Sequence, residues 1–368
     1  MDKRPFFSVV IPCYNSHKTI VRLLDSLTHQ DINKDDLEVI IVDDYSDYLW
    51  YFNILKLFSN LLNIKFIRIE DHNIGYPGPV RELGVLEAIG QYLFFIDHDD
   101  RLENSALHEL MNLLSEYKYP EVLFTKIKRI NDKPEYRKIP LNINIADEDI
   151  IDPKNLNSIN YNRHSLLHGV FFNIDKFWKK YDIHFRKDLK TNEDVYILNT
   201  TKCILNHINK QPIYGDICTY VWYKNPESLS QTLYTQDNEK YDYLSLNFKD
   251  YIEASSGVFK KYYIKKYIDK NIAISTLLHL LLYEYFYMQN LLFSKKKSAI
   301  NDSIIRKNIN LCKEEYKNYK YLFDLKYQDV IADIEKDNGN FYIETLKNVG
   351  CQCIPSYTIY DWFHMLDK

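Results

Sequence analysis

The chain has 368 residues, 46% of them hydrophobic, which is enough for one large or two ordinary globular domains. With a formal net charge of −4, it lacks the overall positive charge that is typical of proteins that bind nucleic acid or an anionic membrane. The six cysteines lack the paired spacing of a zinc site, and no secretory signal is visible, so we expect a reduced, cytoplasmic protein.

Strand and helix signals alternate in the N-terminal part of the chain. Apolar runs of strand length recur at 7–12, 37–43 and 64–69. Apolar residues at helical spacing follow the first run, at Ile20, Leu23, Leu24 and Leu27. Ser16 is a candidate N-cap for that helix, and another helix is expected at 80–88. This β-α-β-α order predicts an α/β fold with a mostly parallel, Rossmann-like sheet flanked by helices.

A fourth apolar run, Tyr92–Ile96, leads directly into three acids, Asp97, Asp99 and Asp100. We expect these acids at the carboxyl edge of the sheet, where open α/β folds bind their ligands. Closely spaced carboxylates repel one another unless a cation is bound. A hard divalent cation with oxygen ligands, shared with substrate phosphates, meets that requirement. A solvated acidic turn or the N-cap of the next helix is the alternative.

The pattern is mixed after these acids. We expect a helix capped by Asn104, a strand at 121–126, and a polar excursion over the active face at 131–160. After residue 235 the sequence is helical in pattern, with very little Gly or Pro. The chain therefore predicts two domains, an α/β domain at 1–235 and an α-helical domain at 236–368.

One segment of the C-terminal part, Ile272–Phe293, is apolar enough to raise the question of a membrane span. Glu284 interrupts it, and a central glutamate is costly in a bilayer. The segment predicts a buried helix instead, while peripheral contact with the inner face of a membrane stays open.

Four motifs occur in a fixed order along the first domain. They are the run from Ser8 to Asn15, the run from Leu37 to Ser46, the stretch from Asn73 to the acids at Asp97 and Asp99, and the run from Thr191 to Asn199. In order and spacing they closely resemble family-two glycosyltransferases, which have the GT-A fold. The resemblance covers about residues 6–232 and leaves the C-terminal third without a counterpart.

The resemblance implies a nucleotide pocket lined by Pro12, Tyr14, Asn15 and Asp44. A carboxylate such as Asp44 can accept the N3–H of uracil, whereas cytosine has no proton at that position. This difference favours a uridine nucleotide. Helix capping is the alternative for Asp43 and Asp44, although it suits one of them better than both.

Arg81 matches the arginine of the family's Ala-Arg-Asn-x-Gly pattern, with Val80 and Glu82 as departures. The resemblance implies that Arg81 faces the nucleotide or its diphosphate, where a guanidinium suits charged oxygens. Glu82 is expected to pair with Arg81 on the helix surface.

The resemblance also implies a bound Mn²⁺ or Mg²⁺ that acts as a Lewis acid on the diphosphate. Asp99 would contact the ion directly, Asp97 would contact the ribose or the ion, and Asp100 is the least constrained of the three. His98 faces either the donor sugar or solvent. His168 and Gly169 lie where acceptor-side residues of the family are often found, but a packed histidine is the interpretation that we favour for His168.

Glu193 and Asp194 occupy the position of the family's catalytic acid pair at the start of a helix. An inverting transfer needs one base to deprotonate the acceptor hydroxyl, and Asp194 matches that position. Glu193 would then bind hydroxyls of the acceptor or donor. The alternative is that both are helix-start acids favoured by the macrodipole.

We therefore predict an inverting, metal-dependent glycosyltransferase that uses a UDP-hexose or UDP-N-acetylhexosamine. The expected acceptor is a hydroxyl of a cell-surface polysaccharide, a teichoic-acid-like polyol-phosphate polymer or a lipid-linked glycan. The C-terminal helices are a candidate element for homo-oligomer formation.

Three rival functions remain at this point. The first is a transferase acting on modified DNA or a protein, although the balanced charge makes nucleic acid a weaker candidate. The second is a nucleotidyltransferase, which would need a Gly-rich phosphate loop that Ser8–Lys18 lacks. The third is a catalytically silent module that binds nucleotide-sugars.

Overall fold

The computed structural model describes residues 4–46, 48–130, 148–151 and 167–223, together with 250, 253, 257, 258, 261, 265–267, 306, 307, 310, 311 and 314. The chain forms two compact units. The first is made of Met1–Leu156, Ser165–Asp188 and Gln211–Asn225, and the second of Asn157–His164, Leu189–Lys210 and Pro226–Lys368. The predicted domain boundary at residue 235 lies outside the described residues and stays a prediction.

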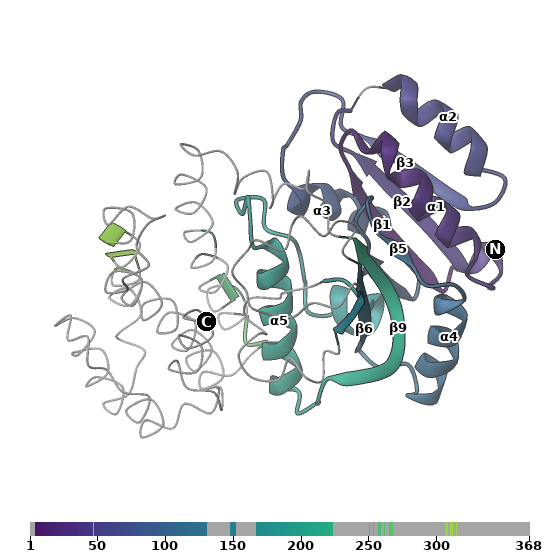
Figure 1. Ribbon diagram of the computed structural model, residues 1–368. Coiled ribbons are helices and arrows are strands. Elements are labelled where there is room, and N and C mark those ends of the chain that lie inside the picture. The colour runs from purple at the N-terminus through teal and green to yellow at the C-terminus, as the bar shows by residue number, and fades with distance from the viewer. Residues whose placement is uncertain are drawn as a thin grey trace, which may run out of the picture. The chain divides into compact units, whose positions relative to one another are not determined.

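The first unit holds the whole described sheet (Figure 1). Its strands are β1 (Phe7–Cys13), β2 (Leu37–Asp43), β3 (Asn63–Arg68), β4 (Tyr92–Phe95), β5 (Arg101–Leu102), β6 (Val122–Ile130), β7 (Glu148–Ile151), β8 (Val170–Asn173) and β9 (Ile213–Tyr223). Its α-helices are α1 (Ile20–Thr28), α2 (Tyr48–Phe58), α3 (Pro77–Glu87) and α4 (Ala106–Glu116). Short 3₁₀ helices span Ser16–Lys18 and Lys34–Asp36, and a π-helix spans Ile174–Lys179.

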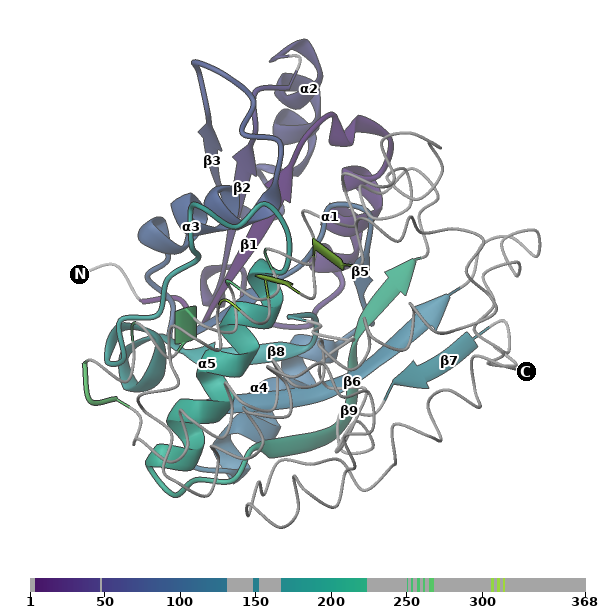
Figure 2. The ribbon, with the colours of Figure 1, turned by 90° about the vertical axis from the view of Figure 1, so that its left-hand side faces the viewer.

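The strand order is β3-β2-β1-β4-β8-β6-β9-β5, with β7 paired to β6 (Figure 2). The four strands β3, β2, β1 and β4 are parallel, because helical crossovers connect them along the chain. Beyond β4 the sheet is mixed, since β8 runs antiparallel to both β4 and β6 while β9 is parallel to β6. The predicted α/β fold is confirmed. Its continuous parallel part is β3-β2-β1-β4, and β6 and β9 form a further parallel pair.

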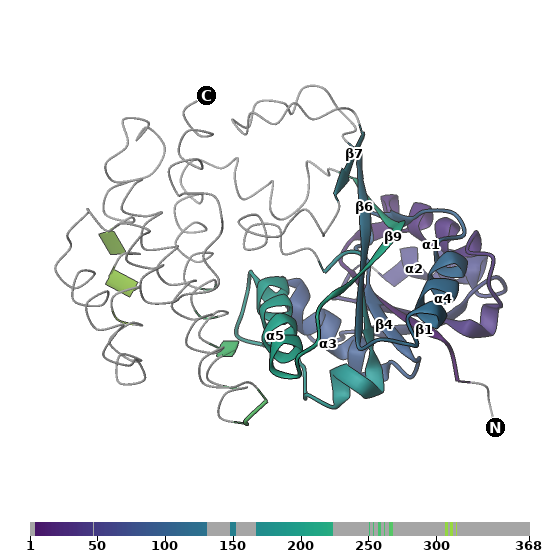
Figure 3. The ribbon, with the colours of Figure 1, turned by 90° about the horizontal axis from the view of Figure 1, so that it is seen from below.

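The two faces of the central strands carry different helices. Phe7, Val9 and Ile11 of β1 belong to a buried cluster with residues of α1, α2 and α4. Val10 of β1 and Val42 of β2 point to the opposite face, where they lie against Gly84 of α3. Figure 3 shows α1, α2 and α4 on one side of the sheet and α3 on the other. Because both faces are covered, these strands are apolar without a polar alternation.

Two predicted helix starts are wrong. Ser16 does not cap α1, because it begins the 3₁₀ helix and its Oγ accepts from the backbone N–H of Tyr14, 3.1 Å away. Asn104 does not cap α4, whose N-cap position is Ser105 in a left-handed conformation with φ of 56°. In both cases the chain turns through an extra local element before the helix begins.

Helix α3 begins at Pro77, three residues before the predicted start at residue 80. The Gly/Pro-rich stretch suggests a turn, but proline is well tolerated in the first turn of a helix, where its missing N–H has no intrahelical partner to lose. Helix α2 is absent from the sequence-based prediction. Its signal is the spacing of Tyr51, Ile54 and Phe58, which form its buried face.

Helix α5 (Glu193–His207) belongs to the second unit and begins at the predicted acid pair. Helical backbone is also found at the C-terminal residues 250, 253, 257, 258, 306, 307, 310, 311 and 314, in agreement with the predicted helical character. Within the described part of the chain, no helix combines the length and apolarity needed to cross a bilayer. Ile272–Phe293 lies outside the described residues.

We expect Gly84→Ala to destabilise the protein, although alanine is normally the better helix former. A Cβ on Gly84 would lie 2.4 Å from Cγ1 of Val10 and 3.1 Å from Cγ2 of Val42, so α3 would have to move away from the sheet. Urea unfolding should show a loss of about 1–3 kcal/mol. The matched control is Leu86→Ala on the same helix, at a side chain that is 66% exposed. Equal stability of wild type and Gly84→Ala would show that the packing tolerates the methyl group.

Candidate active site

The carboxyl ends of β1 and β2 bring the predicted nucleotide-binding residues together. The Asp44 N–H donates to the carbonyl of Cys13 at 2.8 Å, and the Asn15 N–H donates to Ser46 Oγ at 2.6 Å. Pro12 is the penultimate residue of β1, so it lies at the same edge. The structure therefore groups the predicted pocket residues of these two strands.

Two exposed aromatic residues flank this edge. Tyr14 is 52% exposed and Tyr45 is 45% exposed. Asn15 and Tyr45 have left-handed backbones with φ of 48° and 65°. Such conformations cost energy in residues other than glycine, and they concentrate at functional sites. Tyr14 itself is accessible to solvent, as a residue that stacks on a base has to be.

Asp44 is almost fully buried and organises the turn before α3. Its Oδ1 accepts from the N–H of Ile74 at 2.7 Å, and its Oδ2 accepts from the N–H of Gly75 at 2.9 Å. Each carboxylate oxygen has a further lone pair, so these bonds leave acceptor capacity for a base N–H. The predicted contact with uracil stays a prediction.

Asp43 has a structural role. The sequence alone did not distinguish this role from the role of Asp44. It is fully buried, accepts from the N–H of Ser46 at 3.1 Å, and pairs with the guanidinium of Arg68 at 2.7 Å. The guanidinium of Arg68 also lies over the ring of Tyr45, 5.7 Å from its centroid. Asp43 thereby fixes the turn that presents Asp44 and Tyr45.

Arg81 lies in the second turn of α3 and meets the acid loop that follows β4. Its Nη2 donates to Oδ1 of Asp97 at 2.7 Å, and its side chain is only 7% exposed. Since β1 lies between β2 and β4, this ion pair and Asp44 belong to the same edge of the sheet. The structure thus joins two predicted site residues to each other.

The expected surface pairing of Glu82 with Arg81 is wrong. Glu82 is buried and turns toward the segment after the π-helix, where it accepts from the N–H of Phe185 at 2.8 Å. Its other oxygen lies 2.6 Å from Nδ1 of His184. A glutamate at this position thus attaches α3 to residues 184–185 of the same unit.

The three acids have different surroundings. Asp100 is buried, where its Oδ2 accepts from the hydroxyl of Tyr220 at 2.5 Å and its Oδ1 accepts from the N–H of Tyr223 at 2.8 Å. Asp99 is half-buried at the turn, and its carbonyl accepts from the guanidinium of Arg22. Asp100 therefore anchors the loop to β9, whereas Asp99 lies nearer solvent.

His98 is partly exposed. Its Nδ1 lies 2.8 Å from Oγ1 of Thr19, the residue before α1, so it links the acid loop to the start of the first helix. Whether it faces the donor sugar stays a prediction.

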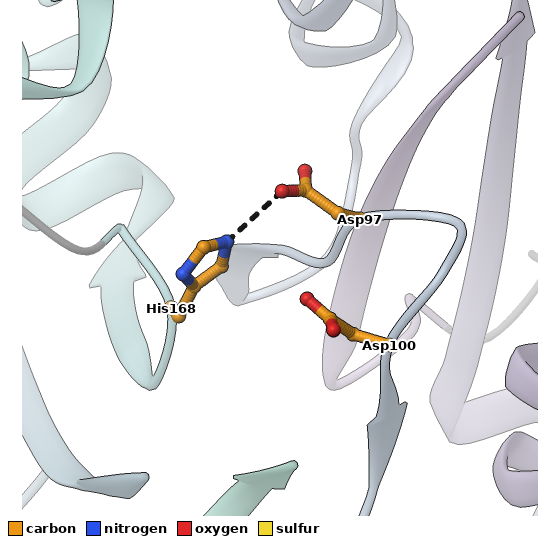
Figure 4. Close-up of side chains that lie close together, drawn as sticks. All are labelled: Asp97, Asp100 and His168. Carbon is orange, nitrogen blue, oxygen red and sulfur yellow. Dashed lines mark hydrogen bonds and ion pairs between the residues drawn. The ribbon is translucent and has the colours of Figure 1, made fainter. Parts of the chain in front are cut away.

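His168 makes a contact with the acid loop that the sequence did not predict. It lies just before β8, and its Nε2 is 3.1 Å from Oδ2 of Asp97 (Figure 4). Its ring packs 4.5 Å from the ring of Tyr220. The expectation of a packed histidine describes its ring correctly but misses its contact with the acid loop. Nothing in the local sequence could have revealed this contact, because the two residues are far apart along the chain.

The charges of the loop shift its acids in opposite directions. Burial alone would raise the pKa of Asp97, but the charge of Arg81 and the hydrogen bond from His168 outweigh it and hold that pKa well below its usual range. Burial and the charges of Asp99 and Asp97 raise the pKa of Asp100 well above its usual value. The pKa values of these two carboxyls are therefore shifted in opposite directions.

The loop has the chemistry of a site for a hard cation. Asp97, Asp100 and His168 lie close together, with one candidate ligand atom of each within 4.8 Å of the others (Figure 4). Nε2 of His168 already contacts Asp97, so the two carboxylates are the oxygen donors of this group. Burial is the largest cause of the raised pKa of Asp100, and repulsion from Asp99 and Asp97 adds to it; a divalent ion would offset that repulsion. Carboxylate oxygens such as those of Asp97 and Asp100 are ligands that Mg²⁺ and Mn²⁺ prefer, and Asp99 does not belong to this group. The direct ligation by Asp99 stays a prediction.

Glu193 and Asp194 form the first turn of α5 in the second unit. Glu193 is buried, and Oδ1 of Asp194 accepts from the N–H of Val195 at 2.8 Å. In the same unit, the buried carboxylate of Asp250 accepts from the N–H groups of Lys190 and Thr191 at 2.9 and 2.8 Å. These bonds fix the chain just ahead of the acid pair, whose catalytic role stays a prediction.

Residues 8–185 match the family model of glycosyl transferase family 2. This region is a family-2 glycosyltransferase domain. It contains Asp44, Arg81, Asp97, Asp99 and His168, and it ends just before the segment that leads to α5. The predicted family is confirmed.

Two relatives from Staphylococcus aureus align with most of the chain. The poly(ribitol-phosphate) beta-N-acetylglucosaminyltransferase TarS is 28% identical over 274 residues, which cover 73% of this chain and 44% of the relative. The poly(ribitol-phosphate) beta-N-acetylglucosaminyltransferase TarP is 29% identical over 272 residues, which cover 72% of this chain and 74% of the relative. The chain thus spans less than half the length of TarS.

Solved structures of TarS share the fold. The crystal structure of TarS 1-349 in complex with UDP-GlcNAc superposes with a TM-score of 0.58 at 20% identity, covering 93% of this chain and 90% of that one. The complex of the same TarS fragment with UDP gives a TM-score of 0.55 at 21% identity. This likeness confirms the predicted GT-A fold class.

We expect Tyr220→Phe to weaken the acid loop, because the hydroxyl of Tyr220 bonds both Asp100 and the N–H of Asp97, at 2.5 and 3.2 Å. Without it Oδ2 of the buried Asp100 loses this donor, and urea unfolding should show a loss of about 1–3 kcal/mol. Tyr223→Phe is the matched control. Its hydroxyl accepts from Nε of the partly exposed Arg101 at 3.0 Å, so its loss should cost less. Equal effects of the two variants would contradict the role given to Tyr220.

Proposed function

We propose that this protein is an inverting, metal-dependent glycosyltransferase that moves N-acetylglucosamine from a UDP-sugar to a hydroxyl of a polyol-phosphate wall polymer. The main observation behind the proposal is that Asp44, Arg81 and Asp97 lie at the same carboxyl edge of the parallel strands. Open α/β sheets bind nucleotides at this edge. The family-2 domain spans the same residues.

The uridine end of the donor belongs at β1 and β2 in this proposal. Tyr14 offers an exposed ring for the base, and Asp44 offers an acceptor for the uracil N3–H. Pro12 and Asn15 complete the wall of this pocket. UDP and UDP-GlcNAc are the ligands in the TarS structures that share the fold, which supports the choice of nucleotide and sugar.

The diphosphate belongs beside the acid loop. Asp97 would contact the ribose or the metal ion, with Arg81 holding its carboxylate in the ionised form. Asp99 would hold Mn²⁺ or Mg²⁺, which as a Lewis acid stabilises the charge that develops on the leaving UDP. Asp100 anchors the loop to β9 through its hydrogen bonds with Tyr220 and Tyr223.

In this proposal the acceptor attacks the donor through a hydroxyl oxygen. Asp194 would remove the proton of the acceptor hydroxyl as that oxygen attacks the anomeric carbon, opposite the leaving UDP, and Glu193 would bind neighbouring hydroxyls. The polyol-phosphate acceptor is inferred from the activities named for TarS and TarP. A cytoplasmic location, peripheral contact with the inner face of the membrane and self-association through the C-terminal helices remain predictions.

UDP should bind in the presence of Mn²⁺ or Mg²⁺, and CDP should bind much more weakly. Cytosine has no N3 proton for Asp44 to accept, while the diphosphate and metal contacts are the same for both nucleotides. Isothermal titration calorimetry with each nucleotide, with the metal and with EDTA, measures both effects. Equal affinities for UDP and CDP would contradict base recognition by Asp44, and metal-independent binding of UDP would contradict the ion.

Asp99→Asn and Asp194→Asn should fail in different ways. Asp99→Asn should weaken both metal-dependent UDP binding and turnover, because the diphosphate loses its counter-charge. Asp194→Asn should bind UDP almost normally but lose about a hundred- to ten-thousandfold in transfer rate, because an amide cannot accept the proton. The assay is transfer from UDP-GlcNAc to poly(ribitol phosphate), with modified DNA as the alternative acceptor.

The linkage formed in this assay tests the mechanism separately. A single displacement converts the α-linked donor into a β-linked product. Near-normal turnover of Asp194→Asn would move the base elsewhere, with Glu193 as the first candidate. Retention of the donor's configuration would overturn the inverting mechanism.

A further inference from the structure

The Asp97 carboxylate is held from two sides by residues of different elements. Oδ1 accepts from Arg81 of α3 at 2.7 Å, and Oδ2 lies 3.1 Å from Nε2 of His168, at the turn before β8 (Figure 4). A carboxylate can only accept, so Nε2 of His168 carries the proton and donates it. One partner on each oxygen fixes the rotation of the carboxylate as well as its position.

The turn that carries His168 is itself rigidly placed. The carbonyl of Gly169 accepts from both the N–H and Oγ1 of Thr125 on β6, at 2.9 and 3.1 Å. Oγ1 of Thr125 in turn lies 2.6 Å from Oγ1 of Thr219 on β9. Gly169 has φ of 67°, and a Cβ there would approach Oγ1 of Thr125 to 2.9 Å, so only glycine fits this turn without strain.

The ring of His168 also packs against a residue that serves the same loop. It lies 4.5 Å from the ring of Tyr220, whose hydroxyl receives the N–H of Asp97 and donates to Asp100. The side chain of His168 is 14% exposed. The sheet therefore fixes the position of His168, and His168 in turn fixes the position of the Asp97 carboxylate through its hydrogen bond.

We propose that His168 is a positioning residue, which orients the Asp97 carboxylate for contact with the donor nucleotide and its metal ion. This inference rests on the proposed function. Residues that orient a ligand group through a hydrogen bond typically contribute about 10- to 100-fold in metal affinity or activity. His168 acts through Asp97 and needs no contact of its own with the substrate.

His168→Leu and His168→Gln separate hydrogen bonding from packing. The glutamine Nε2 can reach the same oxygen and donate, whereas leucine fills space without a donor. His168→Leu should weaken Mn²⁺-dependent UDP binding by about 10- to 100-fold, and His168→Gln should restore most of it. His108→Leu is the matched control, because His108 is exposed on α4 and its Nδ1 contacts only the carbonyl of Asp31 among the described residues.

The measurements are calorimetric affinities for UDP with Mn²⁺ and with EDTA, and the melting temperature of each full-length variant. The proposal predicts that the loss is confined to metal-dependent binding and that melting temperatures stay close to wild type. It is overturned if His168→Leu binds like wild type, if His168→Gln is as impaired as His168→Leu, or if metal-free binding falls equally. If His168→Leu does not fold, the comparison of His168→Gln with wild type decides. A wild-type protein that fails to bind UDP with Mn²⁺ overturns the proposed function itself, and the role of His168 with it.

Discussion

A guanidinium that is nearly excluded from water requires a counter-charge, and Arg81 finds it in Asp97. This pair joins α3 to the loop after β4, and the hydrogen bonds of the sheet do not connect these two elements. It keeps Asp97 ionised, so the acid loop retains negative charge where a cation would bind. Removing Asp97 would leave the buried guanidinium of Arg81 without its counter-charge, which is far more costly than losing an exposed ion pair.

The acids of one short loop acquire distinct roles because their neighbours differ. Asp97 meets a guanidinium and an imidazole, whereas Asp100 meets a hydroxyl and a backbone N–H in a buried position. The pKa of Asp97 is lowered and that of Asp100 is raised as a result. Environments that separate the pKa values of neighbouring carboxyls also suit them to different functions: Asp100 supports the loop, and Asp97 is the residue proposed to contact the ligand.

The departure from the family pattern at Glu82 has a structural explanation. The pattern carries asparagine here, and the longer glutamate extends to the N–H of Phe185 and to His184. Asp182 contacts the other ring nitrogen of His184 at 2.8 Å, so the histidine lies between two carboxylates. This arrangement fixes residues 182–185 to α3, the helix that also carries Arg81. The same helix therefore organises both the acid loop and the last segment of the family-2 domain.

The sequence by itself determined the parallel strands and the acids at their ends. Apolar runs such as 37–43 and 92–96 bury on both faces, and the chain direction then sends Asp44 and Asp97 to one edge. It also identified Arg81, because family motifs record residues at fixed local spacing. Helix α2 could also have been predicted from the sequence, since Tyr51, Ile54 and Phe58 have helical spacing.

Tertiary structure decided which side chain meets which. The helix starts at Ser16 and Asn104 were misread because local turns intervene, and Glu82 found partners more distant in the sequence than its neighbour Arg81. His168 and Tyr220 reach the acid loop only because β8 and β9 return to the sheet beside β4 and β5. Sequence patterns report the periodicity of a single element, whereas hydrogen bonds between elements depend on how the sheet brings distant segments together.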